Sequence, residues 1–377
     1  MTKRQIELVR AVTAAVEPWA ADLPRFFYTL LFERYPQVRE LFPIRMEVQQ
    51  DRLLRALLMI VDLVDDPQHL ATFCADLGRD HRKFGTVTAH YAAVGECLLA
   101  TLAHYAGPSW TPEAAEAWTA AYNTAAQAMD QAALEDARHR PAVWQARVTG
   151  HVRRSHNLAE ITVQPDQPYP YRGGQFVSMT TPWWPRTWRY YSPAHAPRRD
   201  NSITFMVRAL TGGRVSNALV RHAELGDTVT LGPPLGDLAL DARSQRAVVC
   251  VAGGTGLATA RALIEQAVLD GVRRPVDLYV GSRTLEELYA IDDLHQLSRR
   301  HSWLAVRATV ADELTSGSGT QLLNSLAKQG PWPDHDAFLA GPGALVVSAA
   351  RVLHRGGIPI ERLHHDPFVS LDSVGTP

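Results

Sequence analysis

The chain of 377 residues corresponds to two or three domains at the usual ~150 residues per domain. Hydrophobic residues make up 46% and charged residues 20% of it, which excludes a disordered protein, and the net charge of −1 argues against a nucleic-acid partner. Residues 1–137 hold 12 Lys and Arg against 18 Asp and Glu, so the remainder carries a net charge of +5. That division indicates separate modules.

Three cysteines, Cys74, Cys97 and Cys250, lie in apolar contexts without a Cys-x-x-Cys pattern. We therefore expect neither a disulfide framework nor a zinc site. The N-terminal residues lack an apolar signal segment, and no stretch approaches the roughly 18 apolar residues of a membrane span, so we expect a cytoplasmic protein.

Residues 1–138 are predicted to form an all-α domain. Apolar residues recur at spacings of three and four in the segments 6–19 and 53–61, which is typical of amphipathic helices. Proline and glycine interrupt this pattern at intervals, and nothing in the segment alternates as a strand does.

Residues 143–241 are predicted to be a β domain. The short segments 160–163, 175–179, 202–207 and 227–231 are β-branched or alternate between apolar and polar residues, and clusters of Gly, Pro, Asp and Asn separate them. This spacing favours an antiparallel barrel or a sandwich.

Residues 246–377 follow a strand–helix rhythm. An apolar run at 247–252 leads into a Gly-Gly-Thr-Gly turn, a helix from about Ala258 and a second strand at 276–280. This order predicts an α/β nucleotide-binding domain, in which the glycines let a dinucleotide approach the backbone.

Four residues of the helical segment have the chemistry of a haem site, where iron needs a strong ligand, usually histidine, and a distal pocket that binds O2. His81 lies just before a helix break, and Gln49 opens an amphipathic helix 32 residues upstream. Tyr28 and Phe42 precede both. Taken singly, each has a plainer interpretation: a surface histidine at a helix end, a solvated glutamine and two core aromatic residues.

Together with the segments 90–102 and 116–122, these residues resemble the globin domain of bacterial flavohaemoglobins. The resemblance implies that a histidine ligates the iron of haem b, that a tyrosine and a glutamine hold O2, and that a lipid contacts the haem pocket. The residues in these roles are His81 as the iron ligand, Tyr28 and Gln49 at O2, Phe42 against the porphyrin and Leu53 in the distal cavity.

The proximal side departs from the family. There, a glutamate of the last helix joins a tyrosine, which matches Tyr91, in bonding to the histidine ligand, so we count Tyr91 as catalytic. Counting along the last helix places Ala133 where the glutamate is expected, and Asp130, one turn earlier, is a shorter substitute. Asp80 stands where the family has a lysine beside the histidine. These changes affect the electronic environment of the iron.

The run Arg-Tyr-Tyr-Ser at 189–192 fits the Arg-x-Tyr-Ser motif of ferredoxin-reductase-like barrels. The motif implies that the arginine pairs with the flavin pyrophosphate and that the tyrosine packs on the isoalloxazine. Alone it is equally typical of a strand surface, but the segments 173–176 and 212–217 support it by standing in the family's order. The residues implied at the flavin are Phe176, Arg189, Tyr190, Tyr191, Ser192, Gly213, Val215, Ser216, Asp366 and Phe368.

The glycine turn is implied to bind the nicotinamide dinucleotide. Ala340 and Thr259 stand where the family has a cysteine and a proline near the nicotinamide. The Ser282-Arg283 pair suits a 2′-phosphate, but a ribose-facing arginine also occurs in enzymes that use NADH, so both cofactors stay open, with NADH favoured. The residues implied at the dinucleotide are Gly254, Thr255, Gly256, Leu257, Ala258 and Thr259.

The resemblance implies an all-α globin domain, an antiparallel β-barrel FAD domain and an α/β NAD(P)-binding domain. Its activity would be that of an NAD(P)H-dependent nitric oxide dioxygenase, in which electrons pass through FAD to haem and nitric oxide and O2 become nitrate. The implied partners are the small molecules O2, nitric oxide and NAD(P)H, without an obligatory protein partner, and we expect a monomer. Two alternatives remain: a flavohaem oxidoreductase with weak nitric oxide activity and other donors or acceptors, and a haem-based O2 or nitric oxide sensor.

Overall fold

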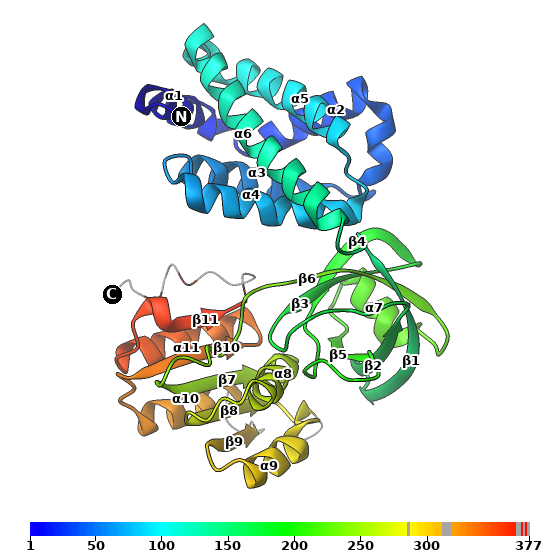
Figure 1. The fold of residues 1–377 in the computed structure, drawn as a ribbon, viewed down its shortest axis with the longest axis vertical. Coiled ribbons are helices and arrows are strands. Elements are labelled where there is room, and N and C mark those ends of the chain that lie inside the picture. Colours follow the sequence, from blue (N-terminus) through cyan, green and yellow to red (C-terminus); the bar gives the residue numbers. More distant parts are fainter. Residues whose placement is uncertain (285–286, 311–317, 367–370, 372–373, 375–377) are drawn as a thin grey trace. The chain divides into compact units, whose positions relative to one another are not determined.

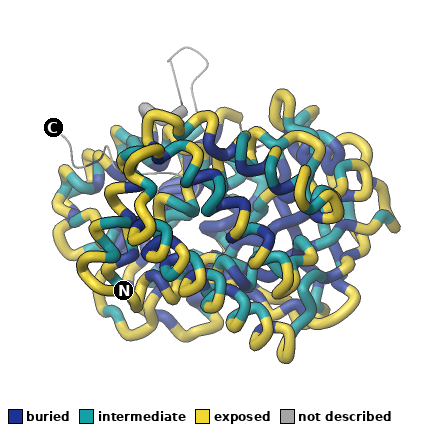
Figure 2. The backbone as a smooth tube through the Cα atoms, turned by 90° about the horizontal axis from the view of Figure 1, so that it is seen from above, coloured by how far each residue is buried: buried dark blue, intermediate teal, exposed yellow. Residues whose placement is uncertain are grey.

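The computed structural model describes residues 1–284, 287–310, 318–366, 371 and 374 (Figure 1). The chain divides into two compact units, Met1–Val143 and Trp144–Pro377. Buried residues, dark blue in Figure 2, alternate with exposed ones along many elements, which present one face to a core, whereas a few strands are buried almost throughout. No helix among the described residues is both long and apolar enough to cross a lipid bilayer.

The first unit is helical, as the sequence predicts. Asp66 accepts a backbone hydrogen bond at 3.2 Å just ahead of Pro67, and Thr111 caps the helix that Pro112 opens. Gly85 ends the turn after the fourth helix with a φ of 78°, a conformation that favours glycine. The helices are α1 (Lys3–Val16), α2 (Leu23–Arg34), α3 (Glu47–Asp62), α4 (Pro67–His81), α5 (Thr88–Ala106) and α6 (Pro112–Ala137), with 3-10 turns at Glu17–Trp19, Pro36–Leu41, Arg82–Phe84 and Gly107–Ser109.

Two glycines let the helices of this unit approach α6 closely. A Cβ atom added to Gly78 of α4 would lie 2.1 Å from the carbonyl oxygen of Met129. One added to Gly95 of α5 would lie 2.5 Å from the ring of Tyr122. Because real Cβ contacts are never that short, any side chain at either position would push the helices apart.

The second unit begins with an antiparallel sheet that carries one helix. The order of its six described strands is β4-β3-β6-β1-β2-β5. The edge strands meet again after β4, where Pro193 bridges to Phe205 and the Ala194 amide donates to the Thr204 carbonyl at 2.7 Å. The sheet therefore curls into a barrel rather than a sandwich. Its elements are β1 (Trp144–Ser155), β2 (Leu158–Pro165), β3 (Phe176–Thr181), β4 (Trp184–Tyr191), β5 (Ile203–Arg208), α7 (Arg214–Arg221) and β6 (Thr228–Leu235).

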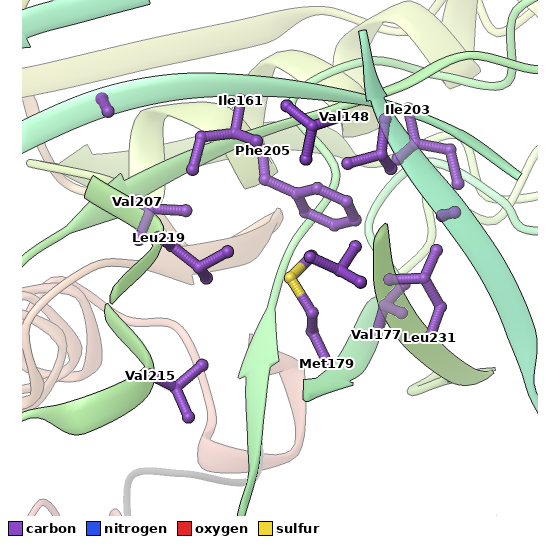
Figure 3. Packing of buried hydrophobic residues seen from close by; sticks show 14 of the residues in the cluster. Val148, Ile161, Val177, Met179, Ile203, Phe205, Val207, Val215, Leu219 and Leu231 are labelled. Carbon is purple, nitrogen blue, oxygen red and sulfur yellow. The ribbon is translucent and has the colours of Figure 1, made fainter. Parts of the chain in front are cut away.

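The barrel encloses a single apolar core (Figure 3). Met179 and Phe205 point toward each other from β3 and β5, and both are fully buried. Val215 and Leu219 of α7 contribute to the same cluster, so the helix closes one side of the barrel. The alternating segments seen in the sequence thus supply one inward-facing row from each strand.

The remainder of the second unit is a parallel sheet in the order β11-β10-β7-β8-β9, with helices between the strands. Consecutive residues of β7 enter two different buried clusters, which shows that both faces of the sheet are covered. The predicted α/β domain is thereby confirmed, although its first helix starts two residues earlier than expected. The elements are β7 (Ala247–Gly253), α8 (Gly256–Leu269), β8 (Val276–Ser282), α9 (Ile291–Arg300), β9 (Leu304–Val310), α10 (Ser318–Gln329), β10 (His335–Ala340), α11 (Gly343–Arg355) and β11 (Leu363–His365), with a 3-10 turn at Ile360–Arg362.

The strand order reverses between β7 and β10, and glycines line the turns that follow these two strands. A Cβ atom on Gly256 would lie 2.4 Å from the carbonyl of Ala340. Gly341 has a φ of 141°, and a Cβ there would lie 2.8 Å from the Gly253 carbonyl oxygen. The two turns are packed backbone to backbone at the switch point, where open α/β sheets bind their ligands.

Candidate active site

His81 is the last residue of α4 and is held by its own helix. Its Nδ1 lies 2.7 Å from the carbonyl oxygen of Leu77, which can only accept, so Nδ1 carries the proton. Burial lowers the pKa of His81. The ring of Phe84 meets it edge to face at 5.8 Å. Within the described part of the chain, no hydrogen bond to Nε2 is found, so a neutral imidazole presents a lone pair, as an iron ligand must.

Tyr28 and Gln49 are brought together from α2 and α3. The Tyr28 side chain is buried, and the Gln49 side chain lies close enough to influence it. Burial raises the pKa of Tyr28 to about 12, while the neighbouring Gln49 side chain acts to lower it. Both side chains are polar groups at the edge of an apolar cluster.

Phe42 packs on the same tyrosine. Its ring lies 5.4 Å from that of Tyr28 at 70°. Leu53, one turn past Gln49 on α3, is partly buried against the same core cluster. The structure thus gathers Tyr28, Gln49, Phe42 and Leu53 around one apolar region that has hydrogen-bond donors at one point. The neutral His81 imidazole, with one nitrogen fixed by Leu77, and this apolar region have the chemistry that a haem requires.

The proximal residues of α5 and α6 are arranged differently from the family pattern. Burial and the nearby charge of Asp130 raise the pKa of Tyr91 to about 12. The Asp130 carboxylate accepts a hydrogen bond from Thr88 at 2.8 Å, and no bond from it to Tyr91 or His81 is found in the described residues. α6 runs without a break from Pro112 to Ala137, so Tyr122, Asp130 and Ala133 all lie on one helix.

Lys83 is a residue that the sequence analysis missed. Its side chain is only 1% exposed, and its Nζ lies 2.6 Å from Asp80 Oδ1. The two residues flank His81, so an ammonium group does lie near the proximal histidine, three residues after the aspartate. The i,i+3 spacing of opposite charges at a helix end was the available signal.

The flavin motif lies on β4. Arg189, Tyr190 and Tyr191 pair with Met179, Ser178 and Val177 of β3. Tyr191 packs on the barrel core, and burial raises its pKa. The Tyr190 ring meets Phe176 edge to face at 5.1 Å. The Arg189 side chain is exposed, with Nη1 donating to the Trp188 carbonyl at 2.8 Å, and Ser192, just past the strand, is partly buried.

The start of α7 lies beside β4 and carries a second arginine. The guanidinium of Arg214 stacks over the ring of Trp184 at 4.5 Å. Gly213 precedes the helix, and the Ser216 hydroxyl accepts a bond from the Leu210 amide at 3.3 Å. Val215 is buried in the barrel, so this segment offers a phosphate its backbone amides rather than the valine side chain.

The dinucleotide turn separates into a surface part and a packed part. Gly254, which has a φ of 54°, and Thr255 are partly exposed. The next four residues are buried, so their side chains pack α8 onto the sheet and only their backbones can meet a nucleotide. These four are Gly256, Leu257, Ala258 and Thr259.

Two carboxyl groups, those of Asp366 and Asp237, lie near each other at the end of β11. Burial and the charge of Asp237 raise the pKa of Asp366 to about 6. A cavity of about 180 Å³ beside it is lined by Asp237, Leu238, Leu363, His364 and His365. Phe368 lies outside the described residues.

Three protein families match successive parts of the chain. The globin family matches residues 25–129, the oxidoreductase FAD-binding domain residues 145–239, and the oxidoreductase NAD-binding domain residues 250–350. The flavohaemoprotein of Bordetella pertussis is 27% identical over 96% of both chains, and that of Deinococcus radiodurans is 26% identical over 98% of this chain and 97% of its own. The chain belongs to the flavohaemoprotein family.

Other similarities concern the fold and the reductase half. The crystal structure of a Malassezia yamatoensis flavohaemoglobin with bound FAD and haem has a TM-score of 0.76 at 16% identity, and covers 97% of this chain and 98% of that one. A ferredoxin–NAD(P)+ reductase component of naphthalene dioxygenase and salicylate 5-hydroxylase systems from Ralstonia is 30% identical over 61% of this chain and 70% of its own. This flavohaemoprotein is an oxidoreductase, and the predicted fold and the cofactors haem, FAD and NAD(P)H are confirmed.

Proposed function

We propose that this flavohaemoprotein is a nitric oxide dioxygenase. In the overall reaction, one NAD(P)H supplies two electrons, and each electron lets one nitric oxide and one O2 combine to nitrate. Haem, when bound, supplies an iron that accepts the electron and binds the gas. The observation that carries the proposal is the buried Tyr28 hydroxyl with the polar Gln49 side chain beside it, which fits O2 better than it fits an apolar ligand.

The residues of the pocket have separate tasks in this proposal. Tyr28 stays protonated at neutral pH because its pKa is about 12, so it can donate a hydrogen bond to dioxygen. Gln49 offers a second polar side chain beside the phenol. His81 is oriented by the Leu77 carbonyl and stays neutral, and Phe42 fills the space beside the tyrosine ring.

The reductase residues have roles in holding cofactors. We assign the flavin pyrophosphate to Arg189 and to the first amides of α7, and the face of the isoalloxazine to Tyr191. The exposed Gly254–Thr255 corner at the switch point takes the dinucleotide. Asp366, with its raised pKa, lies after β11 as a carboxyl group able to hold a proton near neutral pH.

One experiment tests the proposal directly. The holoprotein is mixed anaerobically with NADH while the flavin and haem absorption bands are followed, and O2 and nitric oxide are then added in turn. We expect both bands to show reduction, followed by nitrate formation at two nitrate per NADH. Reduction of the flavin with haem left oxidised would contradict the proposal.

A second candidate function has its own observation. The reductase half is 30% identical to a ferredoxin–NAD(P)+ reductase component, a little above the identity to whole flavohaemoproteins, and the glutamate position of α6 holds Ala133. Both favour an oxidoreductase that delivers electrons to another acceptor with little nitric oxide turnover. Rapid flavin oxidation by an added ferredoxin, faster than by the haem of the same chain, would support this function.

A further inference from the structure

The end of β8 lies level with the dinucleotide turn. Gly253 of β7 pairs with Gly281 of β8, and the Gly254 amide donates to the Gly281 carbonyl at 3.4 Å. Arg283 follows two residues later. In doubly wound sheets, the side chain just after the second strand meets the ribose of the adenosine, where NADH carries a 2′-hydroxyl and NADPH a 2′-phosphate.

The two residues that suit a 2′-phosphate at this position are both engaged within the protein. The Ser282 side chain is buried, and its hydroxyl donates to the Thr284 carbonyl at 2.7 Å. Arg283 is 62% exposed, but its Nη2 donates to Glu287 Oε1 at 2.8 Å and its backbone amide donates to Oε2 at 3.2 Å. One carboxylate therefore grips both the side chain and the backbone of the arginine.

Glu287 also forms an ion pair with an arginine of the barrel. Its side chain is only 10% exposed, and Arg208, the last residue of β5, contacts Oε1 at 2.8 Å. Burial acts to raise the pKa of Glu287, but the bonds from Arg283 and the charge of Arg208 outweigh it and keep the pKa below the ordinary value. The carboxylate is thus a fixed negative charge at neutral pH.

Arg208 also lies near Gly254, which places the Arg208–Glu287 pair beside the dinucleotide turn. Its guanidinium lies 4.0 Å from the point where a Cβ on Gly254 would stand. Asn157 holds its other nitrogen at 3.4 Å. The carboxylate, the two arginines and the glycine turn therefore form one cluster at the carboxyl end of β7 and β8.

We propose that Glu287 makes this flavohaemoprotein selective for NADH, because its carboxylate occupies the donors of Arg283 that a 2′-phosphate on the adenosine ribose would need. The inference names the electron donor of the proposed function and rests on that function's NAD(P)H site. A 2′-phosphate on Arg283 would either displace Glu287, leaving a buried carboxylate with one cation fewer, or lie next to it and be repelled. A 2′-hydroxyl carries no charge and meets neither cost.

The test measures binding rather than turnover. Titration calorimetry on the holoprotein, with haem and FAD in place, compares 5′-AMP with adenosine 2′,5′-bisphosphate, which differ only in the 2′-phosphate. We expect the natural protein to bind 5′-AMP at least as tightly as the bisphosphate. Tighter binding of the bisphosphate overturns the proposal, and this measurement needs no variant to fold.

Variants sharpen the test. Glu287→Gln keeps the shape but removes the charge, and we expect it to tighten binding of the bisphosphate about tenfold, with 5′-AMP within about twofold. Adding Arg283→Ala to this variant should abolish the gain. The matched control is Asp270→Asn, which removes a carboxylate paired with the exposed Arg172 at the opposite end of α8, and it should change neither affinity. An unchanged affinity ratio in Glu287→Gln contradicts the proposal.

The same readout separates this inference from the proposed function. Neither ligand carries a nicotinamide, and neither reacts with O2 or nitric oxide, so the affinity ratio does not depend on haem chemistry. If the protein prefers 5′-AMP but produces no nitrate, the role of Glu287 is supported and the dioxygenase proposal is contradicted. If it produces nitrate but binds the bisphosphate more tightly, the dioxygenase proposal is supported and the role of Glu287 is contradicted.

Discussion

The haem pocket and the dinucleotide site are built in opposite ways. The proposed haem pocket depends on side chains carried by three helices, with Tyr28 on α2, Gln49 on α3 and His81 on α4. The proposed dinucleotide site depends on backbone, in two glycine turns that pack within 3 Å of where side chains would be. A side-chain site depends on a few irreplaceable groups, whereas a backbone site spreads its donors along a turn. Single substitutions should therefore affect the first more sharply than the second.

The largest expected effect is the loss of haem from His81→Ala. The helix keeps its shape, but the only imidazole assigned to iron is gone, so we expect purified protein without a Soret band and with a normal FAD content. Absorption spectra and extracted flavin measure both.

Three other histidines of the helical unit serve as controls for that variant. His69 is bonded to Asp66 at 2.6 Å, and His90 Nδ1 accepts from the Val87 amide at 3.2 Å. His104 stacks on Phe26 at 4.5 Å. Each has a capping or packing task, so its alanine variant should retain haem. An unchanged Soret band in His81→Ala would contradict the assignment of His81 as the iron ligand, and with it the contrast between the haem pocket and the dinucleotide site.

Arg189→Ala tests the flavin site, where the first backbone amides of α7 are also assigned to the flavin pyrophosphate. We expect a lower FAD occupancy, not its complete loss, with the haem content unchanged. Arg189→Lys should restore occupancy only in part, because an ammonium group cannot donate to a diphosphate as a planar fork does. Equal flavin content in all three proteins would show that this arginine is strand surface.

Tyr28→Phe removes the donor of the O2 pocket. A hydrogen bond to a strongly polarised group contributes about 1.5 to 3 kcal/mol, so O2 should dissociate roughly tenfold to hundredfold faster. Gln49→Leu should act in the same direction but less strongly, because it removes the second polar side chain beside the phenol. Stopped-flow O2 dissociation measures both rates, and unchanged values would mean that O2 binds elsewhere in the pocket.

Asp366 should make the stability of the reductase half depend on pH. Burial and the charge of Asp237 raise its folded pKa to about 6 from an ordinary 3.8, so the native state binds more protons than the unfolded state between these values. The contribution of Asp366 to the free energy of unfolding is greatest below pH 4 and decreases as the pH rises to 6. The decrease is on the order of 1–2 kcal/mol after screening. Denaturant titrations from pH 4 to pH 7 should show a flatter profile for Asp366→Asn, and parallel profiles would contradict the assignment.

The smallest expected effect comes from rebuilding the proximal carboxylate with Ala133→Glu. A carboxylate near the histidine ligand increases its electron donation, so the haem potential should fall and the iron–histidine stretching frequency should rise. Glu135→Ala, on the exposed face of α6, is the control for a change on the same helix. If neither quantity moves in Ala133→Glu, the count along α6 from Tyr122 is wrong and Ala133 does not stand at the glutamate position.

Local rules were enough to predict the class of each domain and several of the breaks between its elements. Pro67 and Gly85 act through the conformations that they allow, and the Gly-Gly-Thr-Gly turn acts through the side chains that it lacks. Such constraints operate within a few residues, so they are readable without a fold. The fold class follows from these segments and their order, and the three cofactors follow from the family resemblance that the motifs carry.

Only the tertiary structure decided which charges pair. Glu287 is shared between Arg283, four residues earlier, and Arg208, which arrives from a strand of the barrel. Asp130 of α6 turned out to bond Thr88 of α5 rather than the proximal residues. A charged side chain can satisfy itself with any partner that packing brings within about 3 Å, and packing depends on contacts between distant segments. No spacing along the chain encodes that choice, which is why the partners of Glu287 and of Asp130 had to be found in three dimensions.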